Sequence, residues 1–160
     1  MEEGVADDAF YSARHDPRRC PGHLMLSPTL TTWRLALHIL AAAIWVGGQI
    51  ALAGVVPSLR RVSPEATKAA ARAFSRVAWP AFFVLVVTGI WNLAEVDITD
   101  TSTSYQVTVF VKVTLAIVSG AAAAVHQVGR TKLALALGGA IGLLSALGAL
   151  FLGVLLRTGS

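Results

Sequence analysis

The chain has 160 residues, of which 55% are hydrophobic and 14% are charged, and its mean hydropathy is +0.66. These proportions exclude an ordinary soluble domain, in which about 25% of residues are charged, and they predict an integral membrane protein. The net charge of +4 does not indicate nucleic-acid binding, because basic residues next to membrane spans set topology and contact anionic lipid. We find no phosphate-binding glycine loop, no paired zinc-ligand spacing and no nucleophile elbow, so the sequence offers no catalytic residue.

Residues 1–28 form a polar segment ahead of the first apolar run. This segment contains Gly, Pro and charges of both signs but no apolar signal-peptide core, so we expect a flexible tail and insertion that begins with the first span. Met25 lies immediately before that span and is an alternative start of the chain. Cys20, His23 and Met25 form a cluster of soft metal donors in this tail.

Four apolar segments are long enough to cross a bilayer, which takes about 20 residues. Lipid offers no hydrogen-bond partner to the backbone, so each segment should be a helix. Turn or charge signals separate the segments at Pro57–Pro64, at Asp97–Ser104 and at Gly129-Arg130. We therefore predict an all-α, antiparallel four-helix transmembrane bundle within residues 29–158. Its expected spans are about 30–57, 74–95, 106–128 and 132–156.

The placement of Lys and Arg predicts the orientation, since short cytoplasmic loops are enriched in both. The loop between the second and third spans has no basic residue, whereas the other two loops are basic. Both termini should then lie outside the cytoplasm in a cytoplasmic (inner) membrane protein. The basic loop residues are Arg60, Arg61, Lys68, Arg72, Arg76, Arg130 and Lys132.

Two ionisable residues lie inside the predicted spans. His38 follows the start of the first span by about seven residues and Lys112 follows the start of the third by about six, so both should be roughly 10 Å deep from one surface. Thr88 and Asn92 of the second span come near that depth, and helical periodicity turns all four toward the bundle. An intramembrane charge costs about 3 kcal/mol and often marks a functional site. The competing interpretation is that Lys112 snorkels to the interface and that His38 makes one cross-helix hydrogen bond.

The other conspicuous residues of the spans indicate helix packing rather than a functional site. Small residues of the fourth span predict a face where helices approach closely, and Trp45 with the next two glycines predicts packing. Glu95 lies too close to the aqueous loop for a catalytic carboxylate, and His126 lies about 21 Å from Lys112, too far to share a metal with His38. The small face consists of Gly138, Gly142, Ser145 and Ala149, and the expected interfacial anchors are Trp33, Trp79 and Trp91.

The segments LHILAAAIWVGG, RAFSRVAWPAFFVLVVTGIWN and VFVKVTLAIVSGAAA occur in this order within residues 33–130. This pattern resembles the membrane domain of the copper resistance D family. That family shows a His-containing first helix ending in Trp-x-Gly-Gly, an Arg-Phe-Ser segment leading to Thr-Gly, and a Lys-centred third helix. The matching positions here are His38, Trp45, Gly47, Gly48, Arg72–Ser75, Thr88, Gly89 and Lys112.

The resemblance implies copper homeostasis at the cytoplasmic membrane, by binding, transfer or uptake. His38 is then a candidate copper ligand. Copper(I) also favours thiolate, thioether and imidazole donors, which makes Cys20, His23 and Met25 of the tail candidate copper ligands. The candidate ligand-binding set within the spans is His38, Lys112, Trp45 and Asn92. Many members of the family have eight helices, which a homodimer of this chain would supply.

Two alternatives remain open. A first-helix His and a later Lys are similar to the four-helix protoporphyrinogen oxidase family, which implies haem b with His38 as axial ligand. The small residues that would leave room for haem are Ala41, Ala42, Ala116, Gly120 and Ala123. The other alternative is an accessory subunit of a larger membrane complex, which would use the small face of the fourth span to bind its partner.

Overall fold

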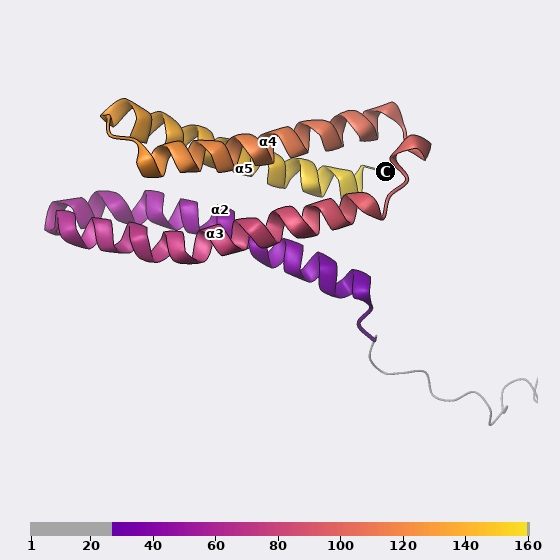
Figure 1. Ribbon diagram of the computed structural model, residues 1–160, viewed down its shortest axis with the longest axis horizontal. Coiled ribbons are helices and arrows are strands. Elements are labelled where there is room, and N and C mark those ends of the chain that lie inside the picture. Colours follow the sequence, from indigo (N-terminus) through magenta and orange to yellow (C-terminus); the bar gives the residue numbers. More distant parts are fainter. Residues whose placement is uncertain (1–26, 160) are drawn as a thin grey trace, which may run out of the picture.

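The computed structural model describes residues 27–159, and Figure 1 shows them as two antiparallel helical hairpins lying side by side. One hairpin is α2–α3 and the other is α4–α5, and the 3-10 turn η1 (Ile98–Asp100) lies in the connection between them. No strand occurs in this part of the chain, so the predicted all-α four-helix bundle is confirmed. The long helices are α2 (Leu30–Val62), α3 (Pro64–Ala94), α4 (Thr103–Val128) and α5 (Lys132–Thr158).

Each long helix begins at a hydroxyl residue that caps its first turn. The side chains of Thr29, Ser63, Ser102 and Thr131 each accept a hydrogen bond from a backbone N–H three residues later. The first hairpin turn is shorter than the predicted Pro57–Pro64 boundary. α2 continues through Pro57, and Ser63 alone separates it from α3, where Pro64 occupies the first helical position and needs no N–H donor. The basic residues of this turn therefore lie on helix ends.

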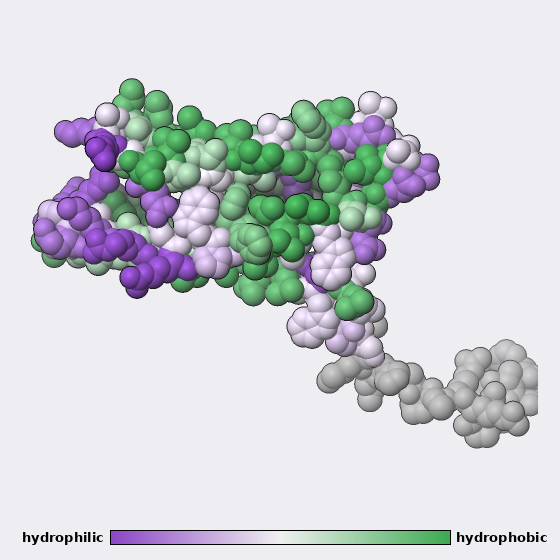
Figure 2. All heavy atoms as spheres, viewed as in Figure 1, coloured by the Kyte–Doolittle hydropathy of each residue, from purple (hydrophilic) through white to green (hydrophobic). Residues whose placement is uncertain are grey.

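The outer surface of the bundle is apolar. Figure 2 shows a hydrophobic belt across the middle of the visible face, with hydrophilic residues gathered at the two ends of the bundle. Large side chains point outward from the helices, including Phe83 at 68% exposure, Phe110 at 72% and Leu144 at 68%. All four helices are long and apolar enough to cross a membrane. The chain is therefore a multi-pass membrane protein whose apolar outer face contacts lipid.

An aromatic cluster fills the space between the hairpins. Trp45 of α2 is buried and packs with Val46, Ala78 and Ala146, and its ring centroid lies 4.4 Å from that of Phe82 and 5.7 Å from that of Trp79. Trp79 therefore packs against the core, although its position near a predicted span end suggested an interfacial anchor. Its indole N–H donates to Gln127 Oε1 at 2.8 Å, next to the last residue of α4, so the polar edge of the ring lies near the end of the bundle.

A buried hydroxyl connects three of the helices. Ser119 of α4 is 1% exposed; its Oγ accepts a hydrogen bond from Trp45 Nε1 at 3.0 Å and donates to the Gly142 carbonyl of α5 at 2.9 Å. The Ser119 hydroxyl and the Trp45 indole N–H therefore find their hydrogen-bond partners inside the protein. Surrounding lipid would supply none.

Glycines permit the closest helix contacts. A Cβ added to Gly138 would lie 2.9 Å from the Ala122 carbonyl oxygen and 2.9 Å from the His126 amide nitrogen, both backbone atoms of α4. The predicted small face of α5 is therefore the surface that packs on α4. In the Trp-x-Gly-Gly motif only Gly48 has such a role, since the Phe74 ring occupies the space next to it. Gly47 has no neighbour within 4 Å of an added Cβ.

These contacts predict that Gly138→Ala destabilises the bundle. The added methyl group would clash with the α4 backbone, so α4 and α5 would have to move apart as whole helices. Overpacking of this kind costs about 1–3 kcal/mol. We expect the unfolding midpoint in mixed detergent–SDS micelles to fall accordingly.

Gly47→Ala is the matched control. Its methyl group would enter open space, and Ala is a better helix former than Gly by about 0.5–1 kcal/mol, so the midpoint should stay or rise. Equal losses in the two variants would contradict the proposed α4–α5 contact.

Candidate functional site

The end of the bundle that carries η1 brings together most of the polar residues inside the spans. His38 lies eight residues after the start of α2 and Lys112 nine residues after the start of α4, and both helices begin at this end. The corresponding depths are about 12 and 14 Å along the helix axes. Thr88 and Asn92 approach the same end on α3, which runs in the opposite direction. The convergence expected from helical periodicity is therefore present.

His38 is held by Thr88 across the α2–α3 contact. The His38 Nδ1 and Thr88 Oγ1 atoms are 2.9 Å apart. The Thr88 hydroxyl donates its single proton to the backbone of its own helix, with Val84 O at 2.7 Å and Leu85 O at 3.2 Å. We assign the hydroxyl proton to this backbone bond, so that Thr88 Oγ1 accepts from His38 and Nδ1 carries the imidazole proton. The lone pair of the neutral ring is on Nε2, to which no group among residues 27–159 makes a hydrogen bond.

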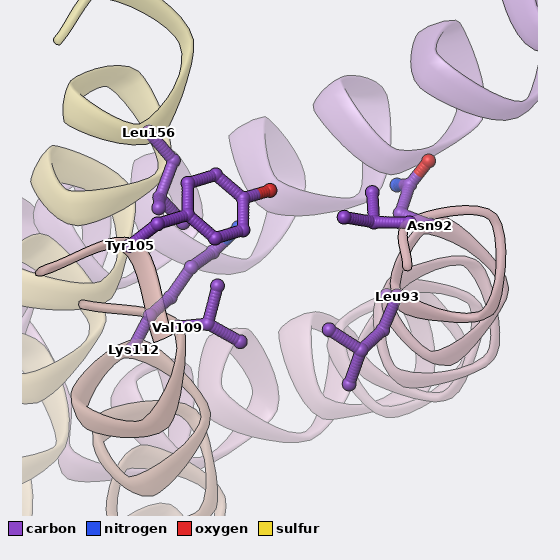
Figure 3. A pocket seen from close by; sticks show the side chains of 8 residues that line it. Asn92, Leu93, Tyr105, Val109, Lys112 and Leu156 are labelled. Atoms are coloured by element: carbon purple, nitrogen blue, oxygen red, sulfur yellow. The ribbon is translucent and has the colours of Figure 1, made fainter. Parts of the chain in front are cut away.

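Lys112 lines a pocket on the other side of Gly89. Figure 3 shows Lys112, Tyr105 and Val109 of α4 with Leu156 of α5 facing Asn92 and Leu93 of α3. Gly89 forms part of this pocket, and a Cβ added to it would lie 3.4 Å from His38 Cε1. His38 and the Lys112 pocket are therefore neighbouring subsites with a glycine between them. Within residues 27–159 no hydrogen bond or ion pair joins His38 to Lys112.

The other residues predicted for the site have different positions. Asn92 lines the Lys112 pocket. Trp45 lies about two turns deeper than His38 on α2 and belongs to the aromatic core, where its indole N–H bonds to Ser119. Cys20, His23 and Met25 lie outside the described residues. Among those that are described, no group of three or more His, Cys, Asp or Glu side chains could hold a metal ion.

The small residues predicted to leave a haem slot are already packed. A Cβ on Gly120 would lie 2.5 Å from the Phe82 ring, which fills the space beside α4. The pocket beside Lys112 has a volume of about 90 Å³, whereas sites for drug-sized ligands measure roughly 300 Å³ or more. Among the residues named for a haem slot, Gly120 thus faces the Phe82 ring rather than open space; haem binding stays a prediction.

An ion pair that was not predicted from the sequence joins this end of α2 to α3. Arg34 is 9% exposed, and its Nη1 lies 3.1 Å from Glu95 Oε1, which also accepts from the indole N–H of Trp91 at 3.1 Å. The Arg34 guanidinium also lies over the Trp91 ring, 5.7 Å from its centroid. Arg34 is one turn from His38 on the same helix, so this contact sets how His38 meets α3. The sequence contained one indication of this ion pair, which is that Arg34 and Glu95 lie at a similar depth in neighbouring spans.

Comparison with known proteins finds no matching family model, no matching curated protein and no matching solved structure.

The Arg34–Glu95 contact predicts that Glu95→Gln weakens the α2–α3 packing at this end. The substitution leaves the nearly buried Arg34 guanidinium without its counter-charge. The Arg34 Nε already has no hydrogen-bond partner among the described residues. Because Glu95 is about half exposed, solvent screens the pair and we expect a loss of about 1–2 kcal/mol, measured as the unfolding midpoint in mixed micelles.

Asp100→Asn is the control at the same end of the bundle, since the Asp100 side chain makes no hydrogen bond or ion pair among residues 27–159. The Asp100 variant should unfold like the wild type. If Glu95→Gln unfolds at the same point as this control, the ion pair does not hold α2 in place.

Proposed function

We propose that this chain is a membrane copper-handling protein of the copper resistance D type, in which His38 takes up the ion from the side of the membrane where the bundle opens. One observation carries the proposal: His38 Nδ1 lies 2.9 Å from Thr88 Oγ1, and Nε2 has no hydrogen-bond partner within residues 27–159. With the proton on Nδ1, the Nε2 lone pair is available to a ligand. Metal-binding histidines commonly donate their other ring N–H to such a partner, which fixes the tautomer and the ring orientation.

The charges around His38 favour transfer of the ion over storage. A single imidazole does not complete a copper site, and the Lys112 ammonium beyond Gly89 opposes the accumulation of positive charge. In this proposal Cys20, His23 and Met25 of the tail deliver copper(I) from the aqueous side, and His38 accepts it inside the membrane.

The distribution of basic residues supports a location for the site. The α2–α3 turn and the α4–α5 turn lie at the same end of the bundle, and both carry Arg and Lys. The opposite end carries η1 and the acidic residues Asp97 and Asp100. By the positive-inside rule the basic end faces the cytoplasm. We therefore place His38 and both termini on the outer side of a cytoplasmic membrane, where copper arrives; a homodimer remains a prediction.

The central test is copper(I) binding to the full chain in detergent, measured by competition with a chromogenic chelator under reducing conditions. His38→Ala removes the ligand and should lower the apparent affinity by more than about 100-fold, since even the loss of a group that only orients a metal ligand lowers affinity by about 10–100-fold. His126→Ala is the matched control, because His126 bonds to the Leu135 carbonyl at the opposite end.

Two results would overturn the copper proposal. Equal affinities of wild type and His38→Ala would show that His38 is not the ligand, and the same assay on Cys20→Ser would then report whether the tail alone binds copper. A Soret band in purified wild-type protein that disappears in His38→Ala would assign His38 to haem.

The role of Thr88 gives a second test. Thr88→Val keeps the shape of the side chain but removes the acceptor that fixes the His38 tautomer, so copper affinity should fall by about 10–100-fold. Thr114→Val is the control, because the Thr114 hydroxyl bonds only to the Phe110 carbonyl of its own helix. A Thr88 variant with wild-type affinity would show that the tautomer is not set by this hydrogen bond.

A further inference from the structure

The pocket between α3, α4 and α5 contains polar groups that the copper proposal does not use. Lys112 and Tyr105 of α4 and Asn92 of α3 line it, together with the apolar side chains of Leu93, Val109 and Leu156. In Figure 3 the Tyr105 hydroxyl points from α4 toward α3, and the Lys112 side chain runs behind the Tyr105 ring.

None of the three polar side chains has a partner within residues 27–159. The Lys112 ammonium, the Tyr105 hydroxyl and the Asn92 amide make no side-chain hydrogen bond there, and Lys112 makes no ion pair. Of the acidic residues at this end, Glu95 pairs with Arg34, Asp97 caps η1 through Thr99, and Asp100 forms no ion pair with Lys112. The pocket therefore presents donors and a positive charge without a counter-ion from the described chain.

The position of Lys112 makes this charge unusual. The Lys112 side chain extends over Gly153 of α5, where an added Cβ would lie 3.3 Å from Nζ. Gly153 thus leaves the space in which the ammonium sits, at a depth where an unpaired charge is unfavourable. An anion bound to Nζ would remove that penalty, and the Tyr105 hydroxyl and Asn92 amide would supply further hydrogen bonds.

The size and the walls of the pocket indicate what kind of anion it suits. Its volume of about 90 Å³ admits a phosphate group but not a large molecule. The pocket is partly open, and the backbones of α3 and α4 do not pack closely along their length. Beside it the outward side chains are apolar, among them Ile90 at 64% exposure and Phe110. A headgroup in the pocket could therefore remain attached to acyl chains in the surrounding lipid.

We propose that this pocket is a binding site for a phosphate anion, supplied by the headgroup of an acidic phospholipid, with Lys112 as its counter-charge and Tyr105 and Asn92 as hydrogen-bond donors. Basic pockets between transmembrane helices bind lipid headgroups by the same chemistry. The site uses none of the groups that hold copper in the proposed function, so its test does not depend on copper binding at His38.

The test is native mass spectrometry of the full chain released from micelles that contain phosphatidylglycerol or phosphatidylcholine with identical acyl chains. The wild type should retain one phosphatidylglycerol in preference to phosphatidylcholine. Lys112→Gln should retain about tenfold less, because it loses a charge-assisted hydrogen bond. Lys112→Arg should restore retention, and Lys132→Gln, at the opposite end of α5, should behave as wild type.

Equal retention of phosphatidylglycerol by wild type and Lys112→Gln would overturn the proposal. If Lys112→Gln fails to fold, Tyr105→Phe removes one donor alone, and unchanged retention in both Tyr105→Phe and Asn92→Leu would overturn it equally. Glycerol 3-phosphate added to the lipid-bound protein separates the two sources of the anion. Displacement of the lipid by this soluble ester would assign the pocket to free phosphate esters, whereas no displacement supports the lipid headgroup.

Discussion

The arrangement of all four helices depends on the buried Ser119 hydroxyl. Lipid chains are as apolar as the helix surfaces, so burial alone does not drive the two hairpins together, and close packing with satisfied polar groups must do so. Ser119 accepts from Trp45 of the first hairpin and donates to the Gly142 carbonyl of the second. The second bond requires the α4 and α5 backbones to approach, which Gly138 and Gly142 permit. The bond from Trp45 to Ser119 fixes the indole ring against which Trp79 and Phe82 pack.

This constraint acts on the middle of the bundle and leaves the η1 end to other interactions. Toward that end α2 passes α3 and extends away from the α4–α5 hairpin (Figure 1). Its contacts there are with α3, through Arg34–Glu95 and His38–Thr88. The space between α3 and α4 at the same end becomes the pocket beside Lys112. The polar residues thus occupy the part of the membrane domain where helix packing is least complete, and ligands can reach them there.

The features that could be predicted from the sequence are those that depend on a single helix. Hydropathy identified the spans, and periodicity identified the small face of α5 and the common depth of His38, Thr88, Asn92 and Lys112. It did not predict the turn at Ser63, because Pro57 was interpreted as a boundary and yet lies within α2. The inward position of Trp79 and the pairing of Arg34 with Glu95 depend on how two helices cross, which no single-helix pattern specifies. The structure also distinguishes Gly48, which faces Phe74, from Gly47, which faces open space.

The separation of His38 from Lys112 by Gly89 links the two proposed sites through charge. The Lys112 ammonium opposes a copper ion at His38 Nε2, and an anion beside Lys112 would cancel part of that opposition in a medium that screens charge poorly. Such coupling is reciprocal, so copper at His38 would also favour the anion. A residue larger than Gly at position 89 would stand between the two subsites, where its Cβ alone would contact the His38 ring. The Thr-Gly pair at residues 88 and 89 therefore has two physical roles: the hydroxyl orients the imidazole, and the glycine keeps the path between the two charges free of side chain.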